Sequence, residues 1–234
     1  MRRLLLPAVA LAFALVPAIA ADNKPIEPFN GKDLKGWKLK DEKKSKWKAV
    51  GVQMDPKNEK ALAEVPLAPG TSAFLANTTN GGADISTEEK FGDVVLELEF
   101  MVPKGSNSGI YLMGEYEVQI LDSFGKPDDK LTQGDLGALY SAAAPKKNFA
   151  KKPGEWQKFV IEFQAPKFGP DGKKTANAKF LSVSLNGEEI HKNVEMKQQT
   201  PGGLTGKEAA TGPLMFQGDH GPVAFRNIKI TPKK

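Results

Sequence analysis

The sequence predicts an all-β fold, either an antiparallel sandwich or a barrel. Short runs alternate between apolar and polar residues with a period of two, which is typical of strands with one buried face. The 23 glycines and 17 prolines separate these runs, and no stretch shows a convincing amphipathic helical stripe with end caps. Strands that are divided by turn signals and lack crossover helices favour an antiparallel arrangement.

The expected strands can be justified one after another along the chain. In the first run, Leu96, Leu98 and Phe100 alternate with Glu97 and Glu99, so one face is apolar and the other charged. The segment 85–91 could form one helical turn. A tight hairpin is predicted by the Asn-Gly pair at 186–187. The expected strands are residues 91–102, 107–113, 115–122, 136–141, 156–165 and 221–230, together with the hairpin 178–191.

The N-terminus predicts a cleaved signal peptide over residues 1–20. Arg2 and Arg3 precede an apolar run, and the small residues Ala18 and Ala20 suit a signal peptidase. A membrane anchor is the alternative, which two prolines and the shortness of the run disfavour. We therefore expect a periplasmic or secreted protein with no membrane span after cleavage, folded as one domain over residues 26–232. The chain has no cysteine, so its fold cannot rely on disulfides.

The charge pattern selects no macromolecular partner. The formal net charge is +5, and the lysines are spread along the chain apart from two short runs at 41–48 and 145–153. Such runs usually form solvated loops. Because aromatic residues are not interleaved with the basic ones, a nucleic-acid partner is not expected.

The stretch GEYEVQILDS at 114–123 concentrates carboxylates on one expected strand. Strand parity places Tyr116 and Val118 on a core face. It places Glu115, Glu117 and Gln119 on a polar face that should meet solvent or a cleft. Asp122 has the parity of the core face, where an ionised carboxylate would be costly. It therefore lies either in a turn just past the strand end, or on the polar face through a β-bulge.

The bulge alternative has a parallel among concanavalin A-like endoglucanases. Their strand motif reads Glu, apolar, Asp, apolar, apolar, Glu, and its two outer carboxylates perform retaining hydrolysis. The run from Glu117 to Asp122 resembles it. However, Gln119 replaces the middle acid and Asp122 the last Glu, so an ordinary retaining glycosidase is disfavoured.

A closer resemblance covers nearly the whole chain. In order, the sequence carries motifs that together resemble the bacterial 3-keto-disaccharide hydrolase family. They are PFNGKDLKGWK (28–38), KGSNSGIYLMGEYEVQILDS (104–123), GALY (137–140), KPGEWQKFVIEF (152–163), LNGEEIHKNVE (185–195) and FQGDHGPVAFRNIKI (216–230). This resemblance implies a concanavalin A-like β-sandwich, or jelly roll, that cleaves glycosides oxidised at C3. One departure is Gly218, an extra residue between Gln217 and the Asp-His-Gly motif.

The implied chemistry defines what the site must contain. A ketone at C3 acidifies the C2 proton, so a base can form an enolate, the C1 substituent leaves and water adds later. The site needs a general base, a group that stabilises the enolate oxygen, and an acid for the leaving group. A divalent cation is a candidate stabiliser, although the sequence does not reveal the cofactor. Four aspartates at 122, 128, 129 and 135 match no metal motif.

Three residues are the catalytic candidates: Glu117, Asp122 and His220. Glu117 and Asp122 are candidate bases or ligands, and the alternatives are a solvent-facing strand glutamate and a turn-capping aspartate. His220 is one of only two histidines and lies in a glycine-rich turn, where an imidazole can exchange protons or bind a metal. His191 follows a hairpin and is expected at the surface.

Six further residues are expected to bind substrate. Asn107 and Tyr111 share strand parity, Gln119 can bind sugar hydroxyls, and Tyr140 can stack on a sugar ring. Arg226 shares parity with residues 224 and 228, and could clamp an oxyanion, pair with Glu117 or form a structural ion pair. The set of substrate-binding candidates is Asn107, Tyr111, Gln119, Tyr140, Gln217 and Arg226.

The sequence thus favours an exported enzyme, a hydrolase or lyase whose substrate is a carbohydrate, namely an oxidised 3-keto-glycoside. The alternative is a non-catalytic, lectin-like carbohydrate-binding module that uses the same groove. An ordinary retaining glycosidase is a third hypothesis, supported only by the spacing of Glu117 and Asp122.

Overall fold

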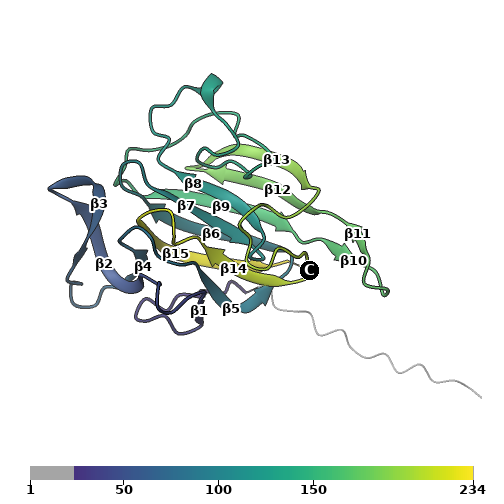
Figure 1. Ribbon diagram of the computed structural model, residues 1–234, viewed down its shortest axis with the longest axis horizontal. Helices are drawn as coiled ribbons and strands as arrows, with labels where there is room; N and C mark the ends of the chain where they lie inside the picture. Colours follow the sequence, from purple (N-terminus) through teal and green to yellow (C-terminus); the bar gives the residue numbers. More distant parts are fainter. Residues whose placement is uncertain (1–23, 234) are drawn as a thin grey trace, which may run out of the picture.

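The computed structural model describes residues 24–233, which form two stacked antiparallel β-sheets (Figure 1). The expected signal peptide at 1–20 lies outside the described residues. The larger sheet has the order β13 (Glu188–Met196), β12 (Ala178–Leu185), β9 (Gln157–Gln164), β6 (Val94–Met101), β15 (Val223–Pro232), β4 (Phe74–Asn77), β2 (Trp47–Asp55) and β3 (Asn58–Val65). The smaller sheet has the order β1 (Trp37–Leu39), β5 (Ile85–Phe91), β14 (Gly212–Phe216), β7 (Asn107–Leu112) and β8 (Tyr116–Leu121).

The remaining elements are small. A short hairpin joins β10 (Lys167–Phe168) to β11 (Lys174–Ala176), and one 3-10 turn, η1, spans Asp128–Lys130. Within residues 24–233 there is no α-helix, and no helix long and apolar enough to cross a bilayer. The all-β antiparallel sandwich predicted from the alternating pattern is therefore confirmed.

The core lies between the two sheets and is filled by the apolar parity of each strand. On β9, Phe159, Ile161 and Phe163 are buried, while the residues between them are more exposed. Phe216 of β14 stacks on Phe225 of β15 with ring centroids 4.0 Å apart, which joins the two sheets. Aromatic contacts of this kind add to the stabilisation from burial, which a chain without disulfides depends on.

Strand β8 lies at the edge of the smaller sheet but is buried on both faces. Its core face carries Tyr116 and Val118, as parity predicts. The polar face was expected to meet solvent or a cleft, yet Glu115, Glu117 and Gln119 are only 4%, 2% and 5% exposed. The loop that follows β13 and the segment after η1 hydrogen-bond to the free edge of β8 and cover this face.

Three local expectations are wrong. Residues 85–91 form strand β5 instead of a helical turn, because β1 and β14 pair with it on both sides. Tertiary pairing readily overrides weak local propensity. Residues 136–141 form only isolated bridges at Leu139 rather than a strand.

His191 is the third correction, since it is buried and not at the surface. Its Nε2 lies 2.8 Å from the carbonyl oxygen of Gly137, and burial lowers the pKa of its imidazole. The segment around Gly137 also pairs with β8, so His191 helps to hold the cover of that strand.

Candidate active site

The outer face of β7 and β8 gathers most of the candidate site residues. The register pairs Tyr111 with Glu117 and Gly109 with Gln119. Directly opposed residues of an antiparallel pair project to the same face, so these side chains lie side by side. The backbone N–H of Gln217 donates to the carbonyl of Gly109 at 3.0 Å, which brings Gln217 to the other side of β7.

The Glu117 carboxylate leans across β7 over Gly109. A methyl group built at position 109 would overlap with Oε1 of Glu117 and with the ring edge of Tyr111. The missing side chain at Gly109 therefore provides the space in which the carboxylate lies. In the sequence Gly109 is only one residue of a strand motif, because close approach across a sheet leaves no signal in a single sequence.

Burial gives Glu117 unusual acid–base properties. Removal from water raises the pKa of its carboxyl group from 4.5 to about 7. A hydrogen bond from Tyr111 and the positive charge of His220 lower this pKa, while the negative charges of Asp84 and Asp219 raise it again. The structure thus brings Glu117, Tyr111 and His220 close enough to interact, together with two aspartates that the sequence did not single out.

Tyr111 is fully buried beneath the loop after β13. Burial and the charge of Glu117 both raise the pKa of the Tyr111 phenol, so the hydroxyl stays protonated and can donate. A Cβ atom built on Gly202 would lie 3.0 Å from this hydroxyl, which shows how closely the loop approaches.

Glu115 fixes that loop. Its carboxylate accepts hydrogen bonds from the N–H and hydroxyl of Thr205 at 2.8 and 2.7 Å and from the N–H of Gly206 at 3.1 Å. The hydroxyl of Thr200 in turn accepts the N–H of Glu117 at 3.1 Å. Charge-assisted bonds of this type are stronger than neutral ones, so Glu115 serves the site by anchoring its cover.

His220 projects from the turn between β14 and β15. Its Nδ1 is hydrogen-bonded to the carboxylate of its neighbour Asp219, and about half of its side chain is exposed. Asn77 holds the turn by donating to the carbonyls of Gly218 and Gly221 at 2.6 and 3.3 Å. Position 218 requires glycine, because a side chain there would collide with Ala83 and Trp47.

Three buried amide oxygens on this face have no partner among the described residues. They belong to Asn107, Gln119 and Gln217, all predicted to bind substrate. Buried polar atoms are nearly always hydrogen-bonded, so these three oxygens are candidates to accept hydrogen bonds from a ligand. A hydroxyl group can both donate and accept, and therefore suits an amide in either orientation.

Asp122 lies outside this cluster. The pairing of β7 with β8 contains no register shift, and β8 ends at Leu121. The Asp122 carboxylate accepts the N–H of Gly105 at 2.9 Å and that of Phe124 at 3.3 Å. Of the two alternatives from the sequence, the structure has the turn and not the bulge.

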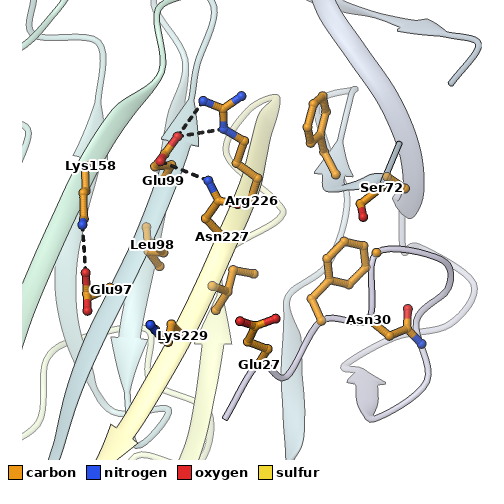
Figure 2. Close-up of a pocket in the computed structure, with 15 residues that line it drawn as sticks. Glu27, Asn30, Ser72, Glu97, Leu98, Glu99, Lys158, Arg226, Asn227 and Lys229 are labelled. Carbon is orange, nitrogen blue, oxygen red and sulfur yellow. Dashed lines mark hydrogen bonds and ion pairs between the residues drawn. The ribbon is translucent and has the colours of Figure 1, made fainter. Parts of the chain in front are cut away.

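Arg226 lies on the larger sheet and is not brought together with Glu117. Figure 2 shows it in a hollow of about 680 Å³, where its guanidinium binds Glu99 at 2.7 Å; it also lies 4.1 Å from the ring centre of Trp156. A register shift after Arg226, with Asn227 at a φ of 51°, puts Ile228 in the core and Arg226 outside. The parity expected for residues 226 and 228 is therefore wrong.

Three carboxylates line this hollow; Glu27 is exposed, and Glu97 and Glu99 are poor candidates for a base. Lys158 lowers the pKa of Glu97. Burial raises the pKa of Glu99, but hydrogen bonds from Asn227 and Arg226 lower it further than burial raises it. Both groups are ion-paired and weakly basic, in contrast to Glu117. We therefore place the candidate active site at Glu117, although Glu97 and Glu99 are the more exposed carboxylates.

Removing Arg226 should affect stability and not Glu117. Arg226→Ala is expected to lower the free energy of unfolding by roughly 1 kcal/mol, because a partly exposed ion pair and a cation–π contact are lost. The Glu117 pKa, measured by carbon-13 NMR, should stay unchanged. Lys158→Ala, which removes an exposed ion pair without a ring contact, is the matched control. A rise in the Glu117 pKa would show that Arg226 acts on the site after all.

Metal ligation finds little support in the described part of the chain. Residues 24–233 contain no group of three or more His, Asp or Glu side chains placed to hold a metal ion. In the loop after β8, Asp135 is bound by Lys126 at 2.7 Å, and Asp128 accepts the N–H of Asn148 at 2.8 Å.

Comparisons with known proteins identify a matching family and solved structures with a similar fold. A family model described as the 3-keto-alpha-glucoside-1,2-lyase-like domain matches residues 24–231. A solved candidate glycosyl hydrolase from Parabacteroides distasonis is 27% identical, with a TM-score of 0.63 over 89% of this chain and 84% of that one. A second from the same organism is 18% identical, with a TM-score of 0.58 over 90% and 94%. Among curated proteins no relative matches.

Proposed function

Because this chain belongs to the family of 3-keto-alpha-glucoside-1,2-lyase-like domains, we propose that it cleaves 3-keto-glycosides with Glu117 as the general base. Family and similar structures make it a carbohydrate-active domain of the glycosyl hydrolase type. The oxidised substrate and the roles of individual residues are the proposed part, as is the export expected from residues 1–20. The observation that carries the proposal is a buried carboxyl group with a pKa of about 7.

The reaction begins at C2 of the keto sugar. Glu117 removes the C2 proton, and the electron pair of that C–H bond moves into the adjacent C3 carbonyl to give an enolate. When the carbonyl re-forms, the pair makes a C1–C2 double bond and the C1–O bond breaks. The leaving oxygen takes a proton, so one alcohol is eliminated. Addition of water across the double bond then completes hydrolysis.

The environment of Glu117 suits this first step. The strength of a general base rises with its pKa, and the best compromise lies near the working pH. A carboxylate at its ordinary pKa would be a weaker base for a carbon acid. Burial beside Tyr111 also restricts the carboxylate to one position, which favours transfer from a fixed C–H bond.

His220 is proposed as the acid for the leaving group. Its Nδ1 is held by Asp219, which orients the ring, and it lies close enough to Glu117 to lower the pKa of that carboxyl group. The unpaired amides of Asn107, Gln119 and Gln217 would bind the sugar hydroxyls or the ketone. Together these groups surround the Glu117 carboxylate with the polar contacts that a sugar requires.

Replacing His220 should matter only for poor leaving groups. His220→Ala is expected to lower kcat for a 3-keto disaccharide by about 10²-fold, since the alkoxide must be protonated as it departs. From a 4-nitrophenyl 3-keto-glucoside the leaving group is 4-nitrophenolate, which departs without an acid. For this substrate kcat should fall only a few-fold. Steady-state kinetics on both substrates measure the difference. Equal losses would assign His220 to another step.

The function itself is tested with paired substrates. The protein should turn over a 3-keto-glucoside and leave the unoxidised glucoside intact. Deuterium at C2 should slow the reaction if proton removal is rate-limiting, and C2 deuterium should exchange or be lost in the product. A lectin-like module would bind both sugars without turnover, and an ordinary glycosidase would cleave the unoxidised one. Either result would refute the proposal.

A further inference from the structure

The free edge of β8 places a second aromatic residue next to Glu117. The antiparallel bridge between Val118 and Leu139 continues with a hydrogen bond of 3.2 Å from the N–H of Tyr140 to the carbonyl of Glu117. Val118 and Leu139 are both fully buried in the core. The hydrogen bond places Tyr140 next to Glu117 at the free edge of β8, although residues 136–141 form no regular strand.

Tyr140 borders a hollow of about 600 Å³. Tyr140 and Ser141 form one wall, and residues 131–134 form the other. The tyrosine is half-buried, so one part of its ring packs against the protein and the rest faces the hollow. The volume is sufficient for one sugar ring, and Gln133 and Ser141 present exposed polar side chains at the rim.

The hollow is joined to the active site by Gln119. The Gln119 side chain donates to the carbonyl of Gly134 at 3.2 Å, while its own amide oxygen stays buried and unpaired. The Gln119 main chain also holds the other wall, by accepting from Gly137 at 2.8 Å and donating to Ala138 at 2.9 Å. One buried side chain therefore connects the strand that carries Glu117 to Gly134, which lines the hollow.

The walls of the hollow are preformed. Gln133 donates to the carbonyl of Ala142 at 3.2 Å and so ties the two walls together. Ser141 has a φ of 59°, a conformation that is unfavourable for a residue with a side chain. A hydrogen bond of 2.8 Å from the N–H of Ala142 to the carbonyl of Leu139 stabilises this turn. Pre-organised sites lose less entropy when a ligand binds.

We propose that this hollow receives the leaving group of the substrate, as a pyranose ring packed against Tyr140. The inference rests on the proposed function. The leaving group is attached to C1, the carbon next to the one that Glu117 deprotonates, so it must lie close to that carboxylate. On the β7 side Glu117 is flanked by Tyr111 and covered by the loop at Gly202, whereas Tyr140 and the hollow lie at the opposite edge of β8. The C–H face of a pyranose packs well on an aromatic ring.

The test compares two substrates that differ only in the leaving group. Tyr140→Ala should raise KM for an α-linked 3-keto disaccharide about tenfold, as expected from the loss of one aromatic contact, and leave methyl 3-keto-α-glucoside within twofold. Tyr140→Phe should behave like the original chain. Phe124→Ala removes an aromatic residue that is 49% exposed and does not line the hollow, and serves as the matched control.

A binding experiment tests the hollow without turnover. Free glucose, the leaving group of such a disaccharide, should shift the amide NMR signals of residues 131–144 saturably, and Tyr140→Ala should abolish these shifts. Equal kinetic losses for both substrates, or no sugar-dependent shift in this segment, would overturn the inference while leaving the proposed function intact. If neither 3-keto substrate is cleaved, the proposed function fails, and the shifts alone decide whether the hollow binds a sugar.

Discussion

Glu117→Gln is expected to lower kcat for a 3-keto-glucoside by about 10³-fold, the usual contribution of a general base. Glutamine has nearly the same shape and can still occupy the space over Gly109, but it cannot accept the C2 proton. Steady-state kinetics measure the loss, and circular dichroism checks that the β-sandwich is retained. Residual activity within tenfold of the original chain would exclude Glu117 as the base.

The pH dependence follows from the same carboxyl group. Only ionised Glu117 can act as a base, so kcat/KM for the 4-nitrophenyl substrate, whose leaving group needs no acid, should rise about tenfold per pH unit below pH 7 and level off above it. A base at the ordinary value of 4.5 would give a flat profile from pH 5.5 upward. Any activity left in Glu117→Gln should lack this inflection at pH 7.

The stability of the same variant supplies an independent control. The folded-state pKa of Glu117 is raised, so the fold prefers the protonated form and loses stability as the pH rises from 4.5 to about 7. Such a shift corresponds to roughly 3 kcal/mol. Glu117→Gln should therefore unfold at higher urea concentration at pH 8, and this gain should vanish below pH 4.5.

Glu97→Gln is the matched comparison for that measurement. Lys158 lowers the pKa of Glu97, so its ionised form stabilises the fold above pH 4.5, and the substitution should destabilise the protein or leave it unchanged at neutral pH. If Glu117→Gln were also destabilising at pH 8, the carboxylate would not be held in an unfavourable environment. A destabilising ionised group that persists in a fold is typical of functional sites.

Much of the sandwich could be predicted because alternation survives where one face is buried. Strands β6, β7, β8, β9 and β15 were all expected from their apolar parity, and the hairpin between β12 and β13 from Asn186-Gly187, both of which have positive φ. Strands β2 and β3 carry many charged residues and lie at the end of the larger sheet, so their pattern resembles a loop. Strand pairing alone reveals them.

The candidate site could be predicted only where one strand carries it. Parity along β8 placed Glu117 and Gln119 on one face, and parity along β7 did the same for Asn107 and Tyr111. Only the pairing of the two strands in the structure brings Tyr111 next to Glu117. Asp84 directly precedes β5, and the strand order β5, β14, β7, β8 brings its charge close enough to raise the pKa of Glu117. No local sequence pattern encodes this strand order. Burial of the polar face also depends on distant loops. Arg226 keeps the parity of Ala224, and the register shift after it moves only Ile228 to the core; Arg226 was misplaced because β15 belongs to the larger sheet, which its local pattern does not reveal.

Gly109→Ala should reduce kcat/KM by about 10²-fold without unfolding the protein. The added methyl group would overlap with Oε1 of Glu117 and the ring edge of Tyr111, so the carboxylate must move. A displacement of about 1 Å can cost 10²-fold when a reacting group has to be in register with its target. Alanine is otherwise favourable within a strand relative to glycine, so the loss should not arise from the backbone.

Two comparisons distinguish displacement from general damage. Gly92→Ala introduces the same methyl group where the nearest atom is 3.5 Å away, and should leave activity unchanged. In the background of Glu117→Asp the side chain is shorter by one methylene, so its carboxylate oxygens lie farther from the methyl group at position 109. Gly109→Ala should then cost much less than it does in the original chain. Additive losses in this double-mutant cycle would mean that residues 109 and 117 act independently, contrary to their contact.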